Sequence, residues 1–448
     1  MYLQRSIFSN LEKWKSKKNR KPLILRGARQ VGKTSVLKEF SKSYRYKITL
    51  NLEKPKHKQL FEDNDYIDDI LGILFTKHNI PVGDKSNTLL IIDEIQESPK
   101  AIHLLRYFYE EYPTLHIIAA GSLLEFAIRN THNFPVGRVE FLYIYPFNFQ
   151  EYLLAINQNE LINELNTVPV NSNFHNKLVK LFNYFITVGG MPEVIKTLVN
   201  NNNEDEISYV YESLWSTFQN DMEKYTNSDL ERRITKHIIE SAPNYVNKQV
   251  NLDGFGNSSY SKTQIEDAFR NLNDARIVQL IYPTNSNEIP LCVDYTMNPK
   301  LQFIDTGLLN YCLQIKTLLK NQENLLNVLK GTIIAHAINQ ELISINAITR
   351  YHPTFSIDHK SNCLIDLLYT HEDKIIPIQI ITLENECANT IENYIDQCSH
   401  HYAVQITNKE LSIEQKTTKR GKKYQTLHLP YYLGTKIPNY VEWFIANY

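Results

Sequence analysis

Long apolar runs and cysteines are scarce in this 448-residue chain. No run of about 18 apolar residues occurs, and the N-terminus has no uninterrupted apolar segment, so we expect neither a membrane span nor export. The five cysteines are an odd number and include no Cys-x-x-Cys pair. This argues against a zinc site or a disulfide framework and favours reduced thiols in a cytoplasmic protein.

The chain also lacks net charge. Its 48 Lys and Arg residues nearly balance 49 Asp and Glu residues, which argues against a protein that coats nucleic acid through charge excess. Hydrophobic residues make up 42% and charged residues 22%, as in ordinary globular proteins. The length predicts about three domains.

Short apolar runs alternate with amphipathic helical stretches in the first third of the chain, as in successive βαβ units. Runs such as LLII and HIIAA are nearly continuous, which is typical of strands covered by helices on both faces. We therefore expect an α/β fold with a parallel sheet, whose strands lie at residues 22–26, 47–51, 88–93, 115–120 and 138–143.

The segment GARQVGKT fits the P-loop pattern G-x-x-x-x-G-K-[ST] and lies between an apolar strand and a helix. Its glycines allow backbone N–H groups to approach phosphate oxygens, and the helix start adds a positive dipole. Lys33 should reach the β and γ phosphates, and Thr34 should ligate Mg²⁺. The predicted ATP-binding residues are Gly27, Ala28, Arg29, Gln30, Val31, Gly32, Lys33, Thr34 and Ser35.

Two acids, Asp93 and Glu94, follow the apolar run LLII. Open α/β sheets bind ligands at the carboxyl ends of their strands, so both acids should lie near the P-loop. We expect Asp93 to hold Mg²⁺ and Glu94 to act as general base on the attacking water. This pair favours hydrolysis of a nucleoside triphosphate over its storage.

Three further positions have two interpretations each. Ser122 could sense the γ-phosphate or simply cap the next helix. Arg138 could place a guanidinium on the γ-phosphate, from the same or a neighbouring subunit, or be an ordinary surface residue. The pair Gly189-Gly190 could be functional or only a turn between helices.

Four regions follow from the changing patterns along the chain. Helical periodicity dominates after Pro146, and the segment YSKTQIEDAFRNLNDARIV followed by an apolar strand suggests a winged helix. The last region mixes helices and strands again. The predicted domains are an ATPase core at 1–146, a helical lid at 147–203, a helical and winged-helix region at 204–290, and an α/β domain at 291–448.

These motifs resemble one family: prokaryotic AAA-type ATP-binding proteins that carry the domain of unknown function number 4143. The resemblance rests on Arg5 and on the segments GARQVGKT, IIDEIQ, AAGSLLEF, GRVEFLYIYPFNFQEYL, GGMPEVI, YSKTQIEDAFRNLNDARIV and FIDTGLLNYCL. It implies an AAA core with a helical lid, a winged helix, and a C-terminal domain similar to restriction-type nucleases. It also favours ATP over GTP.

The nuclease-like domain that this resemblance implies lacks most of its catalytic groups. Such domains carry a helical Glu, a strand-ending Asp and a Glu-x-Lys pair, whereas this chain has Ala335, Asp366, Gln379 and Ile381 at those places. One carboxylate cannot hold a catalytic Mg²⁺. We expect no nuclease activity, and we expect Glu341, on the same helix, to lie at the surface.

Basic residues gather in two clusters. The first 33 residues hold ten basic residues and one acid, and the stretch 416–423 contains Lys416, Lys419, Arg420, Lys422 and Lys423. These clusters permit DNA binding, although solvated loops would look the same.

We therefore expect a Mg²⁺-dependent ATPase that acts as a conformational switch on an unknown protein partner. Oligomerisation of the chain is compatible with this expectation. The alternative is a DNA-binding protein, linked to defence or mobile elements, with an accessory ATPase. A P-loop kinase is disfavoured because no arginine pattern for a substrate phosphate is present.

Overall fold

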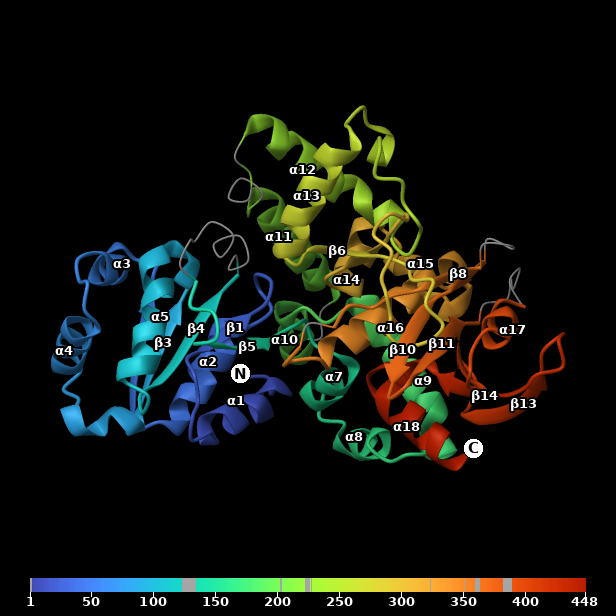
Figure 1. Cartoon of the computed structure of the whole chain (residues 1–448), viewed down its shortest axis with the longest axis horizontal. Helices are drawn as coiled ribbons and strands as arrows, with labels where there is room; N and C mark the ends of the chain where they lie inside the picture. Colours follow the sequence, from blue (N-terminus) through green and yellow to red (C-terminus); the bar gives the residue numbers. More distant parts are fainter. Residues whose placement is uncertain are drawn as a thin grey trace. The chain divides into compact units, whose positions relative to one another are not determined.

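The computed structural model describes residues 2–122, 134–201, 204–221, 226, 228–322, 324–349, 351–358, 363–381 and 389–448 (Figure 1). The chain divides into two compact units. Unit 1 comprises residues 1–145 with two short later segments, 274–276 and 346–350, and unit 2 comprises the rest. Within the described ranges, no helix is both long and apolar enough to cross a membrane.

Unit 1 is built on a five-stranded parallel sheet with the order β2-β3-β4-β1-β5. The expected α/β class and parallel sheet are thus confirmed, with strand bounds within two residues of those expected. The strands are β1 (Leu23–Arg26), β2 (Tyr46–Asn51), β3 (Thr88–Asp93), β4 (His116–Gly121) and β5 (Glu140–Tyr143). β3 and β4 are buried along their whole length because neighbours pair on both sides and helices cover both faces.

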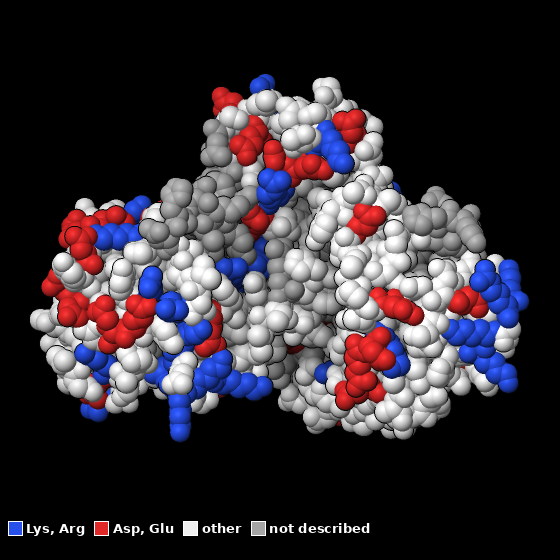
Figure 2. Space-filling model, viewed as in Figure 1, with Lys and Arg blue, Asp and Glu red and all other residues white. Residues whose placement is uncertain are grey.

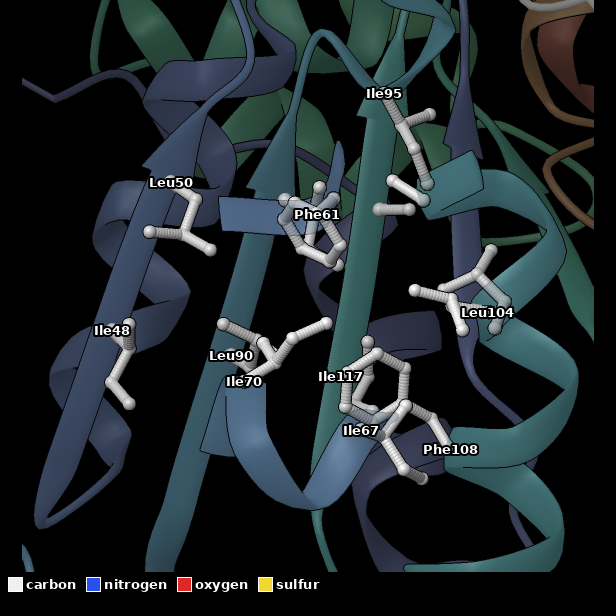
Figure 3. Packing of buried hydrophobic residues seen from close by; sticks show 14 of the residues in the cluster. Ile48, Leu50, Phe61, Ile67, Ile70, Leu90, Ile95, Leu104, Phe108 and Ile117 are labelled. Atoms are coloured by element: carbon white, nitrogen blue, oxygen red, sulfur yellow. The ribbon is translucent and has the colours of Figure 1, made fainter. Parts of the chain in front are cut away.

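Helices α3, α4 and α5 pack on one face of this sheet (Figure 3). Their apolar side chains, including Phe61, Ile70 and Phe108, meet Leu90 of β3 and Ile117 of β4. Burial of each such side chain contributes about 1.5–3 kcal/mol, so this cluster fixes the strand ends that carry the site. The helices of unit 1 are α1 (Ile7–Ser16), α2 (Lys33–Phe40), α3 (Pro55–Glu62), α4 (Ile67–Lys77) and α5 (Pro99–Glu111).

Unit 2 begins with helices. They are α7 (Phe149–Ala155), α8 (Asn159–Leu165), α9 (His175–Val188), α10 (Pro192–Asn201), α11 (Glu204–Asp221), α12 (Asp229–Ser241) and α13 (Lys262–Asp274). A two-stranded antiparallel sheet follows, made of β6 (Val278–Ile281) and β7 (Lys300–Phe303). The helix and the strand expected around YSKTQIEDAFRNLNDARIV are therefore present, while the winged helix itself stays a prediction.

The last part of unit 2 contains a mixed five-stranded sheet with the order β10-β11-β12-β14-β13. Its central pairs are parallel and its outer pairs antiparallel. The elements of this part are α14 (Thr306–Cys312), α15 (Lys316–Lys320), α16 (Thr332–Ser344), β8 (Ser356–Asp358), β9 (Cys363–Ile365), β10 (Leu367–His371), β11 (Lys374–Ile380), α17 (Thr390–Ile395), β12 (Tyr402–Thr407), β13 (Ser412–Thr417), β14 (Lys423–Pro430) and α18 (Ile437–Asn447).

A buried carboxylate, Asp305, organises the middle of unit 2. It is fully buried and accepts hydrogen bonds from the backbone N–H groups of Gly190 and Leu308 and from the hydroxyl of Tyr211. We call Asp305 with these three partners the polar junction. Gly190 has no room for a side chain, since a Cβ there would lie 2.1 Å from the carbonyl oxygen of Phe147. The Gly189-Gly190 pair is thus a tightly packed turn between α9 and α10.

The expectation of reduced thiols is wrong for Cys363, which is disulfide-bonded. Cys292, Cys312 and Cys398 are free thiols. Sequence spacing does not reveal such a pairing, because two cysteines distant in sequence pair only when the fold brings their Cα atoms within about 7 Å.

Candidate nucleotide site

The P-loop lies between β1 and α2 and adopts two left-handed backbone conformations, at Gln30 (φ 63°) and Gly32 (φ 93°). The first glycine is needed for space. A Cβ at Gly27 would lie 2.5 Å from the carbonyl oxygen of Ile144, which follows β5. Ala28 and Val31 are buried, so the loop is anchored by its side chains and offers its backbone to a ligand.

Arg5 braces the loop from below. Its side chain is 5% exposed and donates hydrogen bonds to the carbonyl oxygens of Val31, in the loop, and Tyr145, after β5. A buried guanidinium that joins these two segments fixes the shape of the loop relative to the sheet. Its appearance in the family resemblance thus has a structural explanation.

Lys33 points into the loop. Its Nζ donates to the carbonyl oxygens of Gly27 (2.9 Å) and Ala28 (2.7 Å). Burial lowers the pKa of Lys33 to about 8, and the nearby carboxylates of Glu94 and Asp93 oppose that shift. The two carbonyl acceptors are ones that phosphate oxygens could replace, as expected for a lysine that binds the β and γ phosphates.

Thr34 and Asp93 form the pair that could hold Mg²⁺. The Thr34 hydroxyl donates to Asp93 Oδ2 at 2.8 Å, and Asp93 ends β3 with only 4% of its surface exposed. Burial raises the pKa of Asp93, while the bond from Thr34 lowers it. A hydroxyl beside a carboxylate at the start of α2 is the hard-oxygen set that Mg²⁺ prefers, so the residues present fit this ion.

Glu94 follows in a left-handed conformation (φ 52°, ψ 47°), which turns the chain out of β3 into the 3-10 turn Ile95–Glu97. Its carboxylate accepts a hydrogen bond from Gln96 Nε2 at 2.6 Å. Glu94 is therefore beside Asp93 at the phosphate end of the sheet, where we expected it. Gln96 was not among the predicted site residues, although it lies in the quoted segment IIDEIQ.

Ser122 follows β4 next to this group. Its side chain is buried, and its hydroxyl finds no hydrogen-bond partner among the described residues. The helix that Ser122 was alternatively expected to cap lies outside the described residues, so that choice stays open. Ser35, on α2, is exposed.

Arg138 does not reach the P-loop within this chain. Its Nε donates to Glu110 Oε1 at 2.9 Å near the end of α5, and it precedes β5. Register places the start of β5 (Glu140) beside Leu23 and its end (Tyr143) beside Arg26, so Arg138 lies at the edge opposite the phosphate site. Because the strands are parallel, this position rules out the expected role of Arg138 at the γ-phosphate of its own subunit. A role at the γ-phosphate of a neighbouring subunit stays a prediction.

Arg276 joins the phosphate end of unit 1 from a distant part of the sequence. Its guanidinium lies 4.7 Å from the ring centre of Tyr143, the last residue of β5, and its charge helps to lower the pKa of Lys33. The family segment NDARIV contains this residue, but no local pattern predicts its place beside β5.

Many cations of the N-terminal cluster are used inside unit 1. Arg5 and Lys33 are buried, Arg26 stacks 3.8 Å from the ring centre of Phe141, and Lys17 pairs with Glu140. Arg20 donates to the carbonyl oxygen of Thr114. The count of ten basic residues therefore overstates the charge available to a nucleic acid.

The second cluster lies on the hairpin β13–β14. Lys422 points inward and donates to the carbonyl oxygens of Ile395 and Cys398, and Lys416 pairs with Glu414. In Figure 2, Lys and Arg side chains gather over α1 and over this hairpin. Since part of each cluster serves internal contacts, these contacts do not favour the DNA-binding alternative.

Asp366, which the resemblance places at a nuclease metal site, lies beside Lys300 in unit 2. Asp366 accepts from the N–H of Ile380, and Lys300 Nζ lies 3.9 Å from its other oxygen. Burial raises the pKa of Asp366 and lowers that of Lys300. Within the described part of the chain, no three His, Cys, Asp or Glu residues cluster as metal ligands would.

Glu341 contradicts the expectation of a surface position. It is 1% exposed on α16, and both its carboxylate oxygens accept from the N–H of Phe149, at 3.1 and 3.2 Å. The residues from Ile333 to Leu342 are all buried, so α16 has no exposed face on which a surface glutamate could lie.

Two family models match the chain. Residues 19–153 match an AAA domain, and residues 179–319 match a domain of unknown function (DUF8612). Residues 19–153 contain the P-loop, Asp93, Glu94 and Ser122. The chain therefore contains an AAA domain, which supports an ATPase, and a domain of unknown function. The number 4143 and the nuclease-like end stay predictions.

Several solved structures are similar at low identity. The Walker-type ATPase of Pyrococcus abyssi is 14% identical, with 69% of this chain and 96% of that chain covered and a TM-score of 0.45. A signal transduction ATPase with numerous domains and a tetratricopeptide repeat sensor, from Pyrococcus horikoshii, is 12% identical, with 74% and 44% covered and a TM-score of 0.27.

PCH-2 of C. elegans is also 12% identical, with 41% and 57% covered and a TM-score of 0.23. No curated protein matches the chain. At such low similarity these structures add nothing about function, and the ATPase assignment depends on the AAA domain and the site itself.

Proposed function

We propose that this chain is a Mg²⁺-dependent ATPase whose nucleotide state switches the conformation of unit 2. One observation carries the hydrolysis part: the Thr34–Asp93 hydrogen bond lies beside Lys33, and Glu94 follows directly. Thr34 and Asp93 would hold Mg²⁺, which would neutralise charge on the phosphates. Lys33 would bind the β and γ phosphates, and Glu94 would take the proton of the attacking water.

The reaction balances without a further reactant. An oxygen of water forms a bond to the γ phosphorus, and the bond from that phosphorus to the bridging oxygen breaks, its electron pair leaving with ADP. The proton of the water passes to Glu94 and then to solvent. The products are ADP and inorganic phosphate.

Purified full-length protein should hydrolyse ATP only with Mg²⁺. We expect Lys33→Ala to abolish ATP binding and Glu94→Gln to bind ATP but turn over at least about 100-fold more slowly, because only the proton acceptor is lost. Lys38→Ala and Glu111→Gln are matched controls on exposed positions of α2 and α5. Equal turnover in wild type and both site variants would refute the assignment.

The switch part of the proposal draws on chain continuity. The carbonyl oxygen of Ile144 lies next to Gly27 of the P-loop, and the N–H of Ile144 donates to Arg26. Three residues later, the N–H of Phe147 donates to the carbonyl oxygen of Gly190, whose own N–H donates to Asp305. A shift of the P-loop against β5 would thus be passed along the backbone to the polar junction.

Hydrogen exchange tests this part. In Glu94→Gln, ATP should change the protection of residues 186–190 and 303–308, in unit 2, while ADP should have a smaller effect. The same variant should retain the unknown partner in affinity capture with ATP. Identical exchange of these residues in both nucleotide states would refute the switch but leave hydrolysis intact.

A further inference from the structure

Gln96 lies between the carboxyl ends of β3 and β4. The left-handed Glu94 and the turn Ile95–Glu97 bring its side chain back toward Glu94, and the fully buried Ile95 anchors that turn in the apolar cluster of unit 1. Gln96 Nε2 donates to Glu94 Oε2 at 2.6 Å. One half of the carboxamide is thus committed to the expected general base.

The other half of the carboxamide lies against β4. A Cβ on Gly121, the last residue of β4, would lie 2.4 Å from Gln96 Oε1. Glycine at this position leaves room for the amide, and any larger residue would displace it. Gly121 is not one of the glycines with a positive φ. The need for space, rather than for a left-handed backbone, therefore explains why glycine is found at this position.

The polar atoms around this amide point to a ligand. Gln96 Oε1 and Ser122 Oγ are both buried, and neither finds a hydrogen-bond partner among the described residues. A buried polar atom without a hydrogen-bond partner is destabilising, so a purely structural amide would be expected to have both its polar atoms hydrogen-bonded. At an active site the same atoms can serve a substrate.

We propose that Gln96 is a positioning residue for hydrolysis: its Nε2 orients the Glu94 carboxylate, and its Oε1 accepts a hydrogen bond from the attacking water. This inference rests on the proposed ATPase function. The water would then donate one proton toward Glu94 and the other to Gln96 Oε1, so its lone pair faces the γ phosphorus. Gly121 is required because it leaves room for the amide.

The test compares three variants of the full chain. Gln96→Met keeps the volume but loses donor and acceptor, and we expect kcat to fall about 10–100-fold while KM for ATP changes less than about threefold. Gln59→Met, on the exposed side of α3, is the matched control and should match wild type.

Gly121→Ala provides a second route that leaves the amide in place. It should lower kcat in the wild-type background, because the new methyl group displaces Oε1, but have little further effect in Gln96→Met, so the two changes should not add. ATP affinity and melting temperature, measured for every variant, show that the fold is retained.

The outcomes separate the two proposals. A wild-type chain without Mg²⁺-dependent turnover refutes the proposed function. If the wild type turns over, turnover of Gln96→Met within about twofold of it would refute the role of Gln96 alone, as would additive effects of Gly121→Ala and Gln96→Met.

Discussion

At the scale of single residues, the buried position of Lys33 makes nucleotide binding depend on pH. Burial lowers its pKa to about 8, whereas bound phosphates favour the charged form. Below pH 8 the ammonium is already present and binding needs no proton. Above pH 8 the neutral amine must take up a proton on binding, so ATP affinity should fall by up to about tenfold per pH unit.

Titration calorimetry at pH 7, 8 and 9 measures this effect. Lys33→Arg is the matched control, because a guanidinium stays charged throughout this range and the nucleotide's own ionisation is shared. We expect weaker but nearly pH-independent binding for that variant. A wild-type dissociation constant that is unchanged between pH 7 and 9 would contradict the prediction.

The site residues that a local pattern specifies could be predicted, and those that a tertiary contact specifies could not. Lys33 and Thr34 lie in one motif, and Asp93 and Glu94 end a recognisable strand, so parallel pairing alone brings them together. Gln96 depends on the space left by Gly121 on another strand. Nothing in the segment IIDEIQ indicates that the side chain of Gln96 lies against Gly121.

At the scale of elements, Glu341 connects α16 to the start of α7. Burial raises its pKa to about 8, and the charge of Glu151 adds to this shift. The hydrogen bond from the N–H of Phe149 and the charge of Lys436 oppose the shift. The folded carboxyl therefore holds its proton between about pH 4.5 and 8, while the unfolded one does not. Stability from this group is complete below about pH 4.5 and is lost as the pH rises through 8, by a few kcal/mol.

Glu341→Gln removes this titration, because an amide does not ionise. The amide oxygen can still accept the hydrogen bond from the N–H of Phe149. We expect the variant to gain in melting temperature over wild type between pH 6 and pH 9, as the wild-type carboxyl ionises. Calorimetric melting of both proteins at the two pH values measures the gain, and Glu160→Gln on the exposed side of α8 is the control. An equal difference at both pH values would contradict the prediction.

At the scale of the whole molecule, linear domain boundaries miss how unit 1 is completed. The ATPase core was expected at residues 1–146, but the compact unit also contains residues 274–276 and 346–350. The N–H of Tyr143 on the edge strand β5 donates to the carbonyl oxygen of Ala347 at 2.7 Å, and Arg276 stacks on its ring. Composition and periodicity cannot show that these later segments pack with unit 1, because the segments are short and have no apolar pattern of their own.

A fragment of residues 1–145 should therefore be a poor ATPase domain. It loses the backbone partner of β5 at Ala347 and the cation at Arg276, and β5 becomes an unprotected edge beside the P-loop strand β1. We expect the fragment to aggregate, or to bind ATP at least about tenfold more weakly than the full chain. Gel filtration and a nucleotide titration of both proteins, with full-length Lys33→Ala as the non-binding reference, measure this. A monomeric fragment with the ATP affinity of the full chain would show that the later segments merely lie against a core that is already complete.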